Sequence, residues 1–140
     1  MFTLDDLKKQ NQEISELCEV LSVLVAHKSL HTNPYVCELM SRFKEKVWIH
    51  LVFEDNTIYS GLSEHSDAAI REVARNFHDS GREIKKRFST YLRHWCKPVT
   101  EAIDHDALLE ESEEIFRLIK QRIKYENEQI FPLIAAQQAA

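Results

Sequence analysis

The apolar residues of this 140-residue chain recur at alternating steps of three and four in four separate segments, and no other feature constrains its fold as strongly. Such steps place the apolar residues on one face of a helix, which has to be buried against other helices. The chain has only 2 Gly and 3 Pro, which indicates few turns between long helices. We therefore predict an all-α fold, an up-down-up-down antiparallel four-helix bundle that forms a single domain over residues 1–140.

Residues that typically begin or end helices mark the limits of these segments. The predicted helices run over about 3–28, 33–61 and 66–97, and from 104–106 toward the C-terminus. Pro132 is expected to kink or break the last part of the fourth helix, because proline lacks an N–H group and clashes with the preceding turn. The third helix contains a glycine at position 81. The sequence does not decide whether this glycine marks a local bulge in the helix.

One polar residue falls within or at the edge of each apolar face: Asn11, His50, His78 and Arg122. Glu54 and Glu126 follow one turn after His50 and Arg122. In an antiparallel helical hairpin, residues equally distant from the connection lie at equal height. Each of the three connections places its two flanking polar residues at one level, so all the polar positions are predicted to meet in one layer of the core.

Two readings of this layer follow from the residues. Buried polar groups are costly unless they are paired or bound to metal. The i, i+4 spacing of His50 and Glu54 suits a site for one or two metal ions of the iron class. Alternatively, the fixed charge of Arg122 pairs with the two glutamates in a metal-free ion-pair network.

The segment from His50 to Tyr59 resembles the His-x-x-x-Glu motif of hemerythrin-like (HHE cation-binding) domains. The segments 122–132 and 7–14 resemble two further helices of that family. The resemblance implies a non-haem di-iron centre, with dioxygen or another small molecule as ligand, or a role in iron handling. Carried over by position, it implies four metal ligands: His50, Glu54, His78 and Glu126. Asn11 and Arg122 stand where the family has histidines, and they are expected to line the site without the family's ligand chemistry.

A second resemblance implies a different class of function. The segment from Thr100 to Asp106, followed by the fourth helix, is similar to the corresponding part of the regulator of sigma-D family. That resemblance implies a metal-free bundle that acts by contact with a protein partner.

Composition and charge argue against several other classes of function. The formal net charge of -5 argues against nucleic-acid binding, which needs a basic surface. No apolar run approaches the roughly 18 residues of a membrane span. The N-terminal residues lack the order of a signal peptide, so we expect a cytoplasmic protein. No acid–base pair appears beyond the polar layer, and we therefore expect no enzyme; monomer and homodimer both remain open.

The 3 cysteines are odd in number and show no Cys-x-x-Cys spacing. We therefore expect Cys18, Cys37 and Cys96 to be free thiols packed as small apolar groups.

Overall fold

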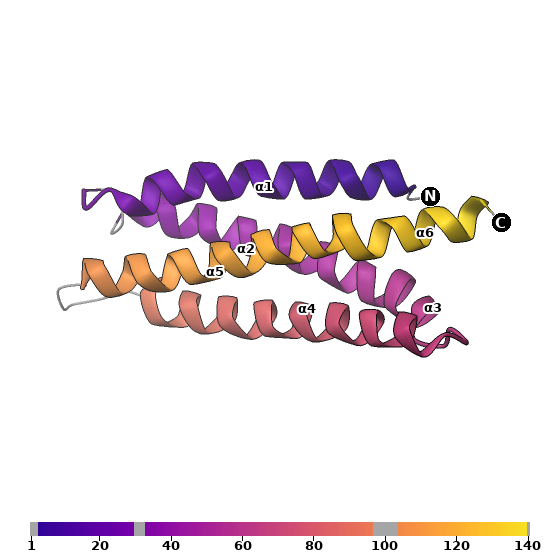
Figure 1. The fold of residues 1–140 in the computed structure, drawn as a ribbon. Coiled ribbons are helices and arrows are strands. Elements are labelled where there is room, and N and C mark those ends of the chain that lie inside the picture. The colour runs from indigo at the N-terminus through magenta and orange to yellow at the C-terminus, as the bar shows by residue number, and fades with distance from the viewer. Residues whose placement is uncertain (1–2, 30–32, 97–103, 140) are drawn as a thin grey trace.

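The computed structural model describes residues 3–29, 33–96 and 104–139 as a four-helix bundle (Figure 1). Its helices are α1 (Leu4–Ala26), α2 (Pro34–Glu54), α3 (Ser60–Leu62), α4 (Ala68–Trp95), α5 (His105–Tyr125) and α6 (Phe131–Ala139). Two π-helical turns, Asp55–Tyr59 and Glu126–Ile130, join α2 to α3 and α5 to α6. The long helices run side by side in alternating directions (Figure 1), which confirms the predicted all-α, up-down-up-down architecture. Within the described ranges, no helix is both long enough and apolar enough to cross a membrane.

The helix starts follow from local capping chemistry. The Thr3 hydroxyl accepts a hydrogen bond from the Asp6 N–H, and the Asp6 carboxylate accepts one from the Thr3 N–H. This reciprocal pair satisfies two amide groups that the first turn of α1 would otherwise leave free. Asn33 caps α2 through its side chain, with Pro34 at the first helical position, where a missing N–H costs nothing.

The irregularities of the helices differ from those expected. Helix α4 is continuous through Gly81, without a bulge, and ends at Trp95; Pro98 lies outside the described residues. The chain also remains helical through Pro132, and the irregularity lies just before it, in the π-helical turn 126–130. In that turn the Phe131 N–H donates to the Glu126 carbonyl, five residues back. π-Helical turns occur often at functional sites.

The apolar core consists of two clusters with the polar layer between them. The larger cluster fills the end of the bundle near the connections that follow α1 and α4, and includes Cys18, Val25, Phe43, Phe88 and Trp95. The smaller cluster fills the opposite end, where α1 begins and α6 ends, and consists of Leu7, Ile58, Leu62, Ala74, Phe77, Ile130 and Phe131.

The expectation of free thiols is wrong for two of the cysteines. Cys37 and Cys96 form a disulfide between the first turn of α2 and the residue that follows the end of α4. The two helices are antiparallel neighbours, so the start of one lies beside the end of the other. Cys18 is free and buried in the larger cluster, as expected.

Candidate metal centre

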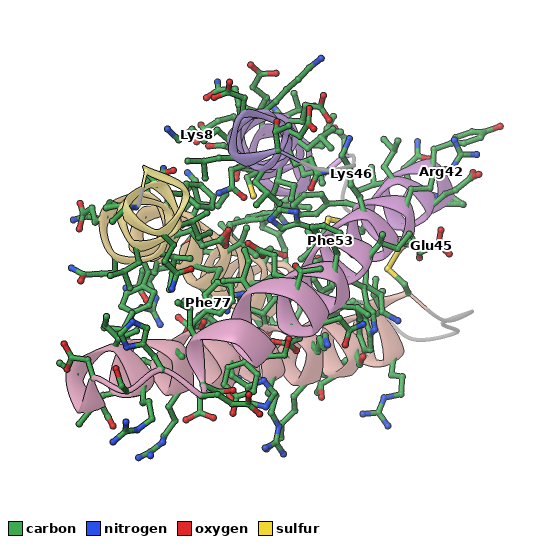
Figure 2. All side chains as sticks on the ribbon, turned by 90° about the vertical axis from the view of Figure 1, so that its right-hand side faces the viewer. Lys8, Arg42, Glu45, Lys46, Phe53 and Phe77 are labelled. Atoms are coloured by element: carbon green, nitrogen blue, oxygen red, sulfur yellow. A yellow bond between two sulfur atoms is a disulfide. The ribbon has the colours of Figure 1, made fainter. Side chains whose placement is uncertain are left out.

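The structure brings all but one of the predicted site residues together in the middle of the bundle. The buried polar residues at this level are Asn11, His50, Glu54, Arg122 and Glu126. They come from α1, α2, α5 and the π-helical turn that follows α5. Figure 2, an end-on view, shows Phe77 pointing into the space between the helices, whereas Arg42 and Glu45 lie on the outer face of α2.

His50 faces both glutamates. Its Nε2 atom lies 3.0 Å from Oε1 of Glu54 and 3.6 Å from Oε1 of Glu126. On the other side of the ring, Nδ1 donates to Oε1 of Gln10 at 2.6 Å. Because this bond places a proton on Nδ1, it directs Nε2 toward the carboxylates. The sequence reasoning missed Gln10, although its place on α1 beside Asn11 sets it at the height of His50.

Arg122 and Asn11 contact the carboxylates from other sides. The Nε atom of Arg122 donates to Oε2 of Glu126 at 3.0 Å, and Nη2 donates to Oε1 of Glu54 at 3.4 Å. The Nδ2 atom of Asn11 donates to Oε1 of Glu126 at 3.2 Å. Glu126 therefore receives charge-assisted and neutral hydrogen bonds, whereas the bond from Arg122 to Glu54 is long.

The surroundings shift the pKa values of Glu54 and Glu126 in opposite directions. Burial, together with the neighbouring negative charge of Glu126, raises the pKa of Glu54. Burial also opposes ionisation of Glu126, but its contacts with Glu54, His50 and Arg122 hold its pKa below the usual range. Burial alone would lower the pKa of His50, but the carboxylates of Glu126 and Glu54 outweigh it and raise that pKa to about 9.

Among the residues that the structure describes, three buried atoms at this level have no hydrogen-bond partner: Oδ1 of Asn11, Nε2 of His50 and Oε2 of Glu54. The short distance from His50 to Glu54 is thus a charge contact without hydrogen-bond alignment. Buried polar atoms are nearly always satisfied, so unsatisfied atoms within one layer of the core need an explanation. His50, Glu54 and Glu126 each offer a ligand atom, and these atoms lie within 4.8 Å of one another. The donor set of one imidazole and two carboxylates fits a single divalent cation.

The structure does not bring His78 into this group. Its Nδ1 atom donates to Oδ1 of Asp55 at 3.2 Å, and its ring stacks on Tyr59 with the centroids 4.3 Å apart. The predicted height is right, since Phe77 beside it reaches the polar layer. The face differs because consecutive helical residues point about 100° apart, and Phe77 occupies the core-facing position.

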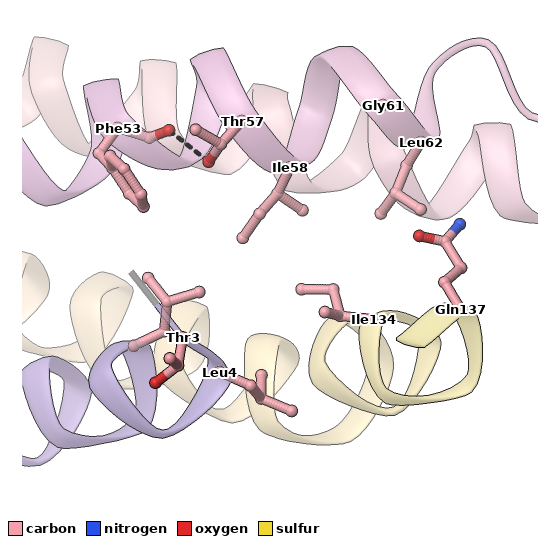
Figure 3. Close-up of a pocket in the computed structure, with 10 residues that line it drawn as sticks. Thr3, Leu4, Phe53, Thr57, Ile58, Gly61, Leu62, Ile134 and Gln137 are labelled. Carbon is pink, nitrogen blue, oxygen red and sulfur yellow. Dashed lines mark hydrogen bonds between the residues drawn. The ribbon is translucent and has the colours of Figure 1, made fainter. Parts of the chain in front are cut away.

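Several cavities open around the described part of the bundle: one of about 230 Å³ is lined by Arg122, Ser80 and Tyr125 among others, and two more adjoin α1. Of the two that adjoin α1, one, of about 340 Å³ between α1 and α2, is lined by His50, Gln10, Ile14, Ile49 and Phe53 among others. The other, of about 470 Å³, lies at the end of the bundle between α1, the turn after α2, and α6 (Figure 3). Phe53 borders both, and the end cavity is mainly apolar, with Leu4, Ile58, Leu62 and Ile134 in its wall.

The fold and the buried group define a class of protein: a four-helix bundle whose core carries imidazole and carboxylate groups at one level. A comparison with family models agrees with this class. The model described as Hemerythrin HHE cation binding domain matches residues 3–134, and the chain belongs to that family. A comparison with curated proteins and one with solved structures each gave no match.

Proposed function

We propose that this protein binds one divalent metal ion of the iron class through His50, Glu54 and Glu126. The observation that carries the proposal is the pair of unpartnered buried atoms on His50 and Glu54, two of the three residues whose ligand atoms lie within 4.8 Å of one another. Membership of a cation-binding domain family supports the same reading. Imidazole together with carboxylate is a donor set that suits iron or manganese.

Each residue of the layer has a distinct role in this proposal. Gln10 holds the Nδ1 proton of His50, so Nε2 is the nitrogen offered to the ion. Glu126 is charged before the ion arrives, and Glu54 supplies the oxygen that lacks a partner. The unpartnered Oδ1 atom of Asn11 can accept a hydrogen bond from a ligand that carries a proton, such as a water molecule in the layer. An iron ion in such a site would supply Lewis-acid and one-electron redox chemistry.

The cavity between α1 and α2 supports a role in binding a small molecule. It reaches His50 from the surface. The ion pair of Glu13 and Lys46 lines part of it, and the wall formed by Ile14, Ile49 and Phe53 is apolar and suits a small neutral ligand such as dioxygen. We propose binding or sensing of such a ligand, without turnover, as the physiological role. His78 is left out of the ligand set because its ring pairs with Asp55 and Tyr59.

Metal content per chain after anaerobic loading with ferrous iron and desalting tests the proposal. We expect about one iron per wild-type chain, and loss of that iron in His50→Ala. His27→Ala is the matched control, since His27 is exposed beyond the end of α1. Absence of iron from the wild-type chain would overturn the proposal. It would favour the alternative function, a metal-free bundle that acts by contact with a protein partner. Part of the segment behind that alternative, residues 100–103, lies outside the described residues.

A further inference from the structure

The guanidinium group of Arg122 lies between the two carboxylates of the proposed metal site. It bonds to Oε2 of Glu126, in the π-helical turn after α5, and to Oε1 of Glu54, at the end of α2. The Arg122 side chain is only 3% exposed. An arginine does not lose its proton in proteins and offers no ligand atom. It therefore places a permanent positive charge between the two carboxylates.

Helix α4 holds this charge in place. The Nη1 atom of Arg122 donates to the Phe77 carbonyl and, at 2.6 Å, to the Ser80 hydroxyl. The guanidinium carbon also lies 3.6 Å from the centroid of the Phe77 ring, in the geometry of a cation–π contact. Every nitrogen of the guanidinium thus has an acceptor.

A glycine on α4 provides the room for the guanidinium. A Cβ atom at Gly81 would come within 3.3 Å of Nη1 of Arg122 and 3.7 Å of Cδ2 of Leu51. Glycine in the interior of a helix lowers helix stability, so a mid-helix glycine needs a packing reason. Arg122 supplies that reason. At Gly61, by contrast, an added Cβ would meet nothing within 4 Å.

The same helix supplies no ligand atom to the group of His50, Glu54 and Glu126. Its histidine, His78, is engaged by Asp55, and what α4 offers the layer is the carbonyl of Phe77 and the hydroxyl of Ser80. Both groups are acceptors directed at a guanidinium. This side of the layer is thus built for a bound cationic side chain.

We infer that Arg122 takes the place of a second metal ion and limits the site to a single ion. The inference rests on the proposed function, since it assumes that a first ion binds at His50, Glu54 and Glu126. One divalent ion and one guanidinium together balance two carboxylates with a single positive charge left over. A second divalent ion would leave three, with repulsion between cations held among buried side chains.

Iron per chain in charge-keeping and charge-removing variants tests the inference. Anaerobic ferrous loading to large excess, followed by desalting, is applied to the wild type, Arg122→Lys and Arg122→His. We expect one iron in the wild type and in Arg122→Lys, which keeps the charge. We expect two in Arg122→His, because a neutral imidazole removes the repulsion and adds a ligand. Circular dichroism checks that each chain is helical, and Arg122→Gln, expected to bind more than one iron, replaces Arg122→His if that chain does not fold.

The outcomes separate the two claims. A wild-type chain that holds no iron overturns the proposed function itself. A wild-type chain that holds two irons leaves metal binding standing and overturns the role of Arg122. A single iron in a helical Arg122→His or Arg122→Gln chain also overturns that role, because the charge would then not be what excludes the second ion.

Discussion

Nη1 of Arg122 lies 3.3 Å from the position that a β-carbon on Gly81 would occupy. The two residues belong to different helices, and each accounts for the other: the glycine makes room for the guanidinium, and the guanidinium fills the space that the glycine leaves.

The first prediction compares the two glycines. Gly61→Ala should raise the free energy of unfolding by up to about 1 kcal/mol, since alanine favours the helix and meets no neighbour. Gly81→Ala should instead lower it by about 1–3 kcal/mol, because the pinned guanidinium cannot move aside. Urea denaturation of both variants measures the difference. Equal stability of the two would show that the guanidinium is free to shift.

The second prediction concerns the orientation of His50. Gln10→Ala removes the acceptor for the Nδ1 proton, so the imidazole loses its fixed direction. We expect the affinity for ferrous or manganous ions to fall about 10–100-fold, as it does when an outer partner of a metal ligand is removed. Gln12→Ala is the control, since the Gln12 side chain is exposed and donates to exposed Glu16 on α1. Isothermal titration calorimetry under anaerobic conditions gives both affinities, and an unchanged value for Gln10→Ala would refute the orienting role.

The features of the fold that could be predicted from the sequence are those that local residue patterns determine. The four helices and their caps at Thr3 and Asn33 were predictable, because apolar periodicity and capping are local. The common level of Asn11, His50 and Arg122 was predictable from distances to the connections. The π-helical turns were not, since an apolar residue at 58 follows Glu54 at a spacing that an ordinary helix also allows.

Side-chain pairing was harder to predict than height. Position along the helix placed His78 at the height of the polar layer, but no pattern in the sequence indicates that its ring pairs with Asp55. The disulfide had a usable signal that was overlooked: the midpoint of positions 37 and 96 falls in the connection before α4. The rule of equal height therefore brings these cysteines together, and the odd total of thiols does not prevent one pair.

The third prediction concerns that disulfide. It closes a loop with a sequence separation of 59 residues, which restricts the unfolded chain. Reduction should lower the free energy of unfolding by about 4 kcal/mol on the chain-entropy model. Denaturation with and without a reductant measures this loss. Cys37→Ser should match the reduced wild type and respond no further to reductant; a continued response would mean that another thiol is involved.

The fourth prediction concerns the free thiol. Burial raises the pKa of Cys18 to about 12, against an opposing effect of Lys120. Below pH 9 the thiol keeps its proton in both the folded and the unfolded chain, so it contributes nothing to pH dependence. Between about pH 9 and pH 12 the unfolded chain releases this proton and the folded chain keeps it. The free energy of unfolding should therefore fall as pH rises, by at most about 1.4 kcal/mol per pH unit.

Denaturation of the wild type and Cys18→Ala at pH 8, 9, 10 and 11 isolates that contribution. Other groups titrate in the same range in both chains, so the informative quantity is the difference between the two slopes. The wild type should show the steeper decline. Parallel slopes would mean that the buried thiol does not resist ionisation.

The polar layer also divides the bundle into two parts, of which the smaller can open locally while the larger stays folded. The smaller apolar cluster at the end where α1 begins is separated from the larger one by buried charges instead of continuous apolar contact. Local opening of that end therefore need not disrupt the rest of the core. Amide hydrogens around Ile58 and Ile130 should exchange sooner than those around Phe43 and Phe88. A cation held across the layer would tie the two parts together, so its binding should register as slower exchange at the smaller end.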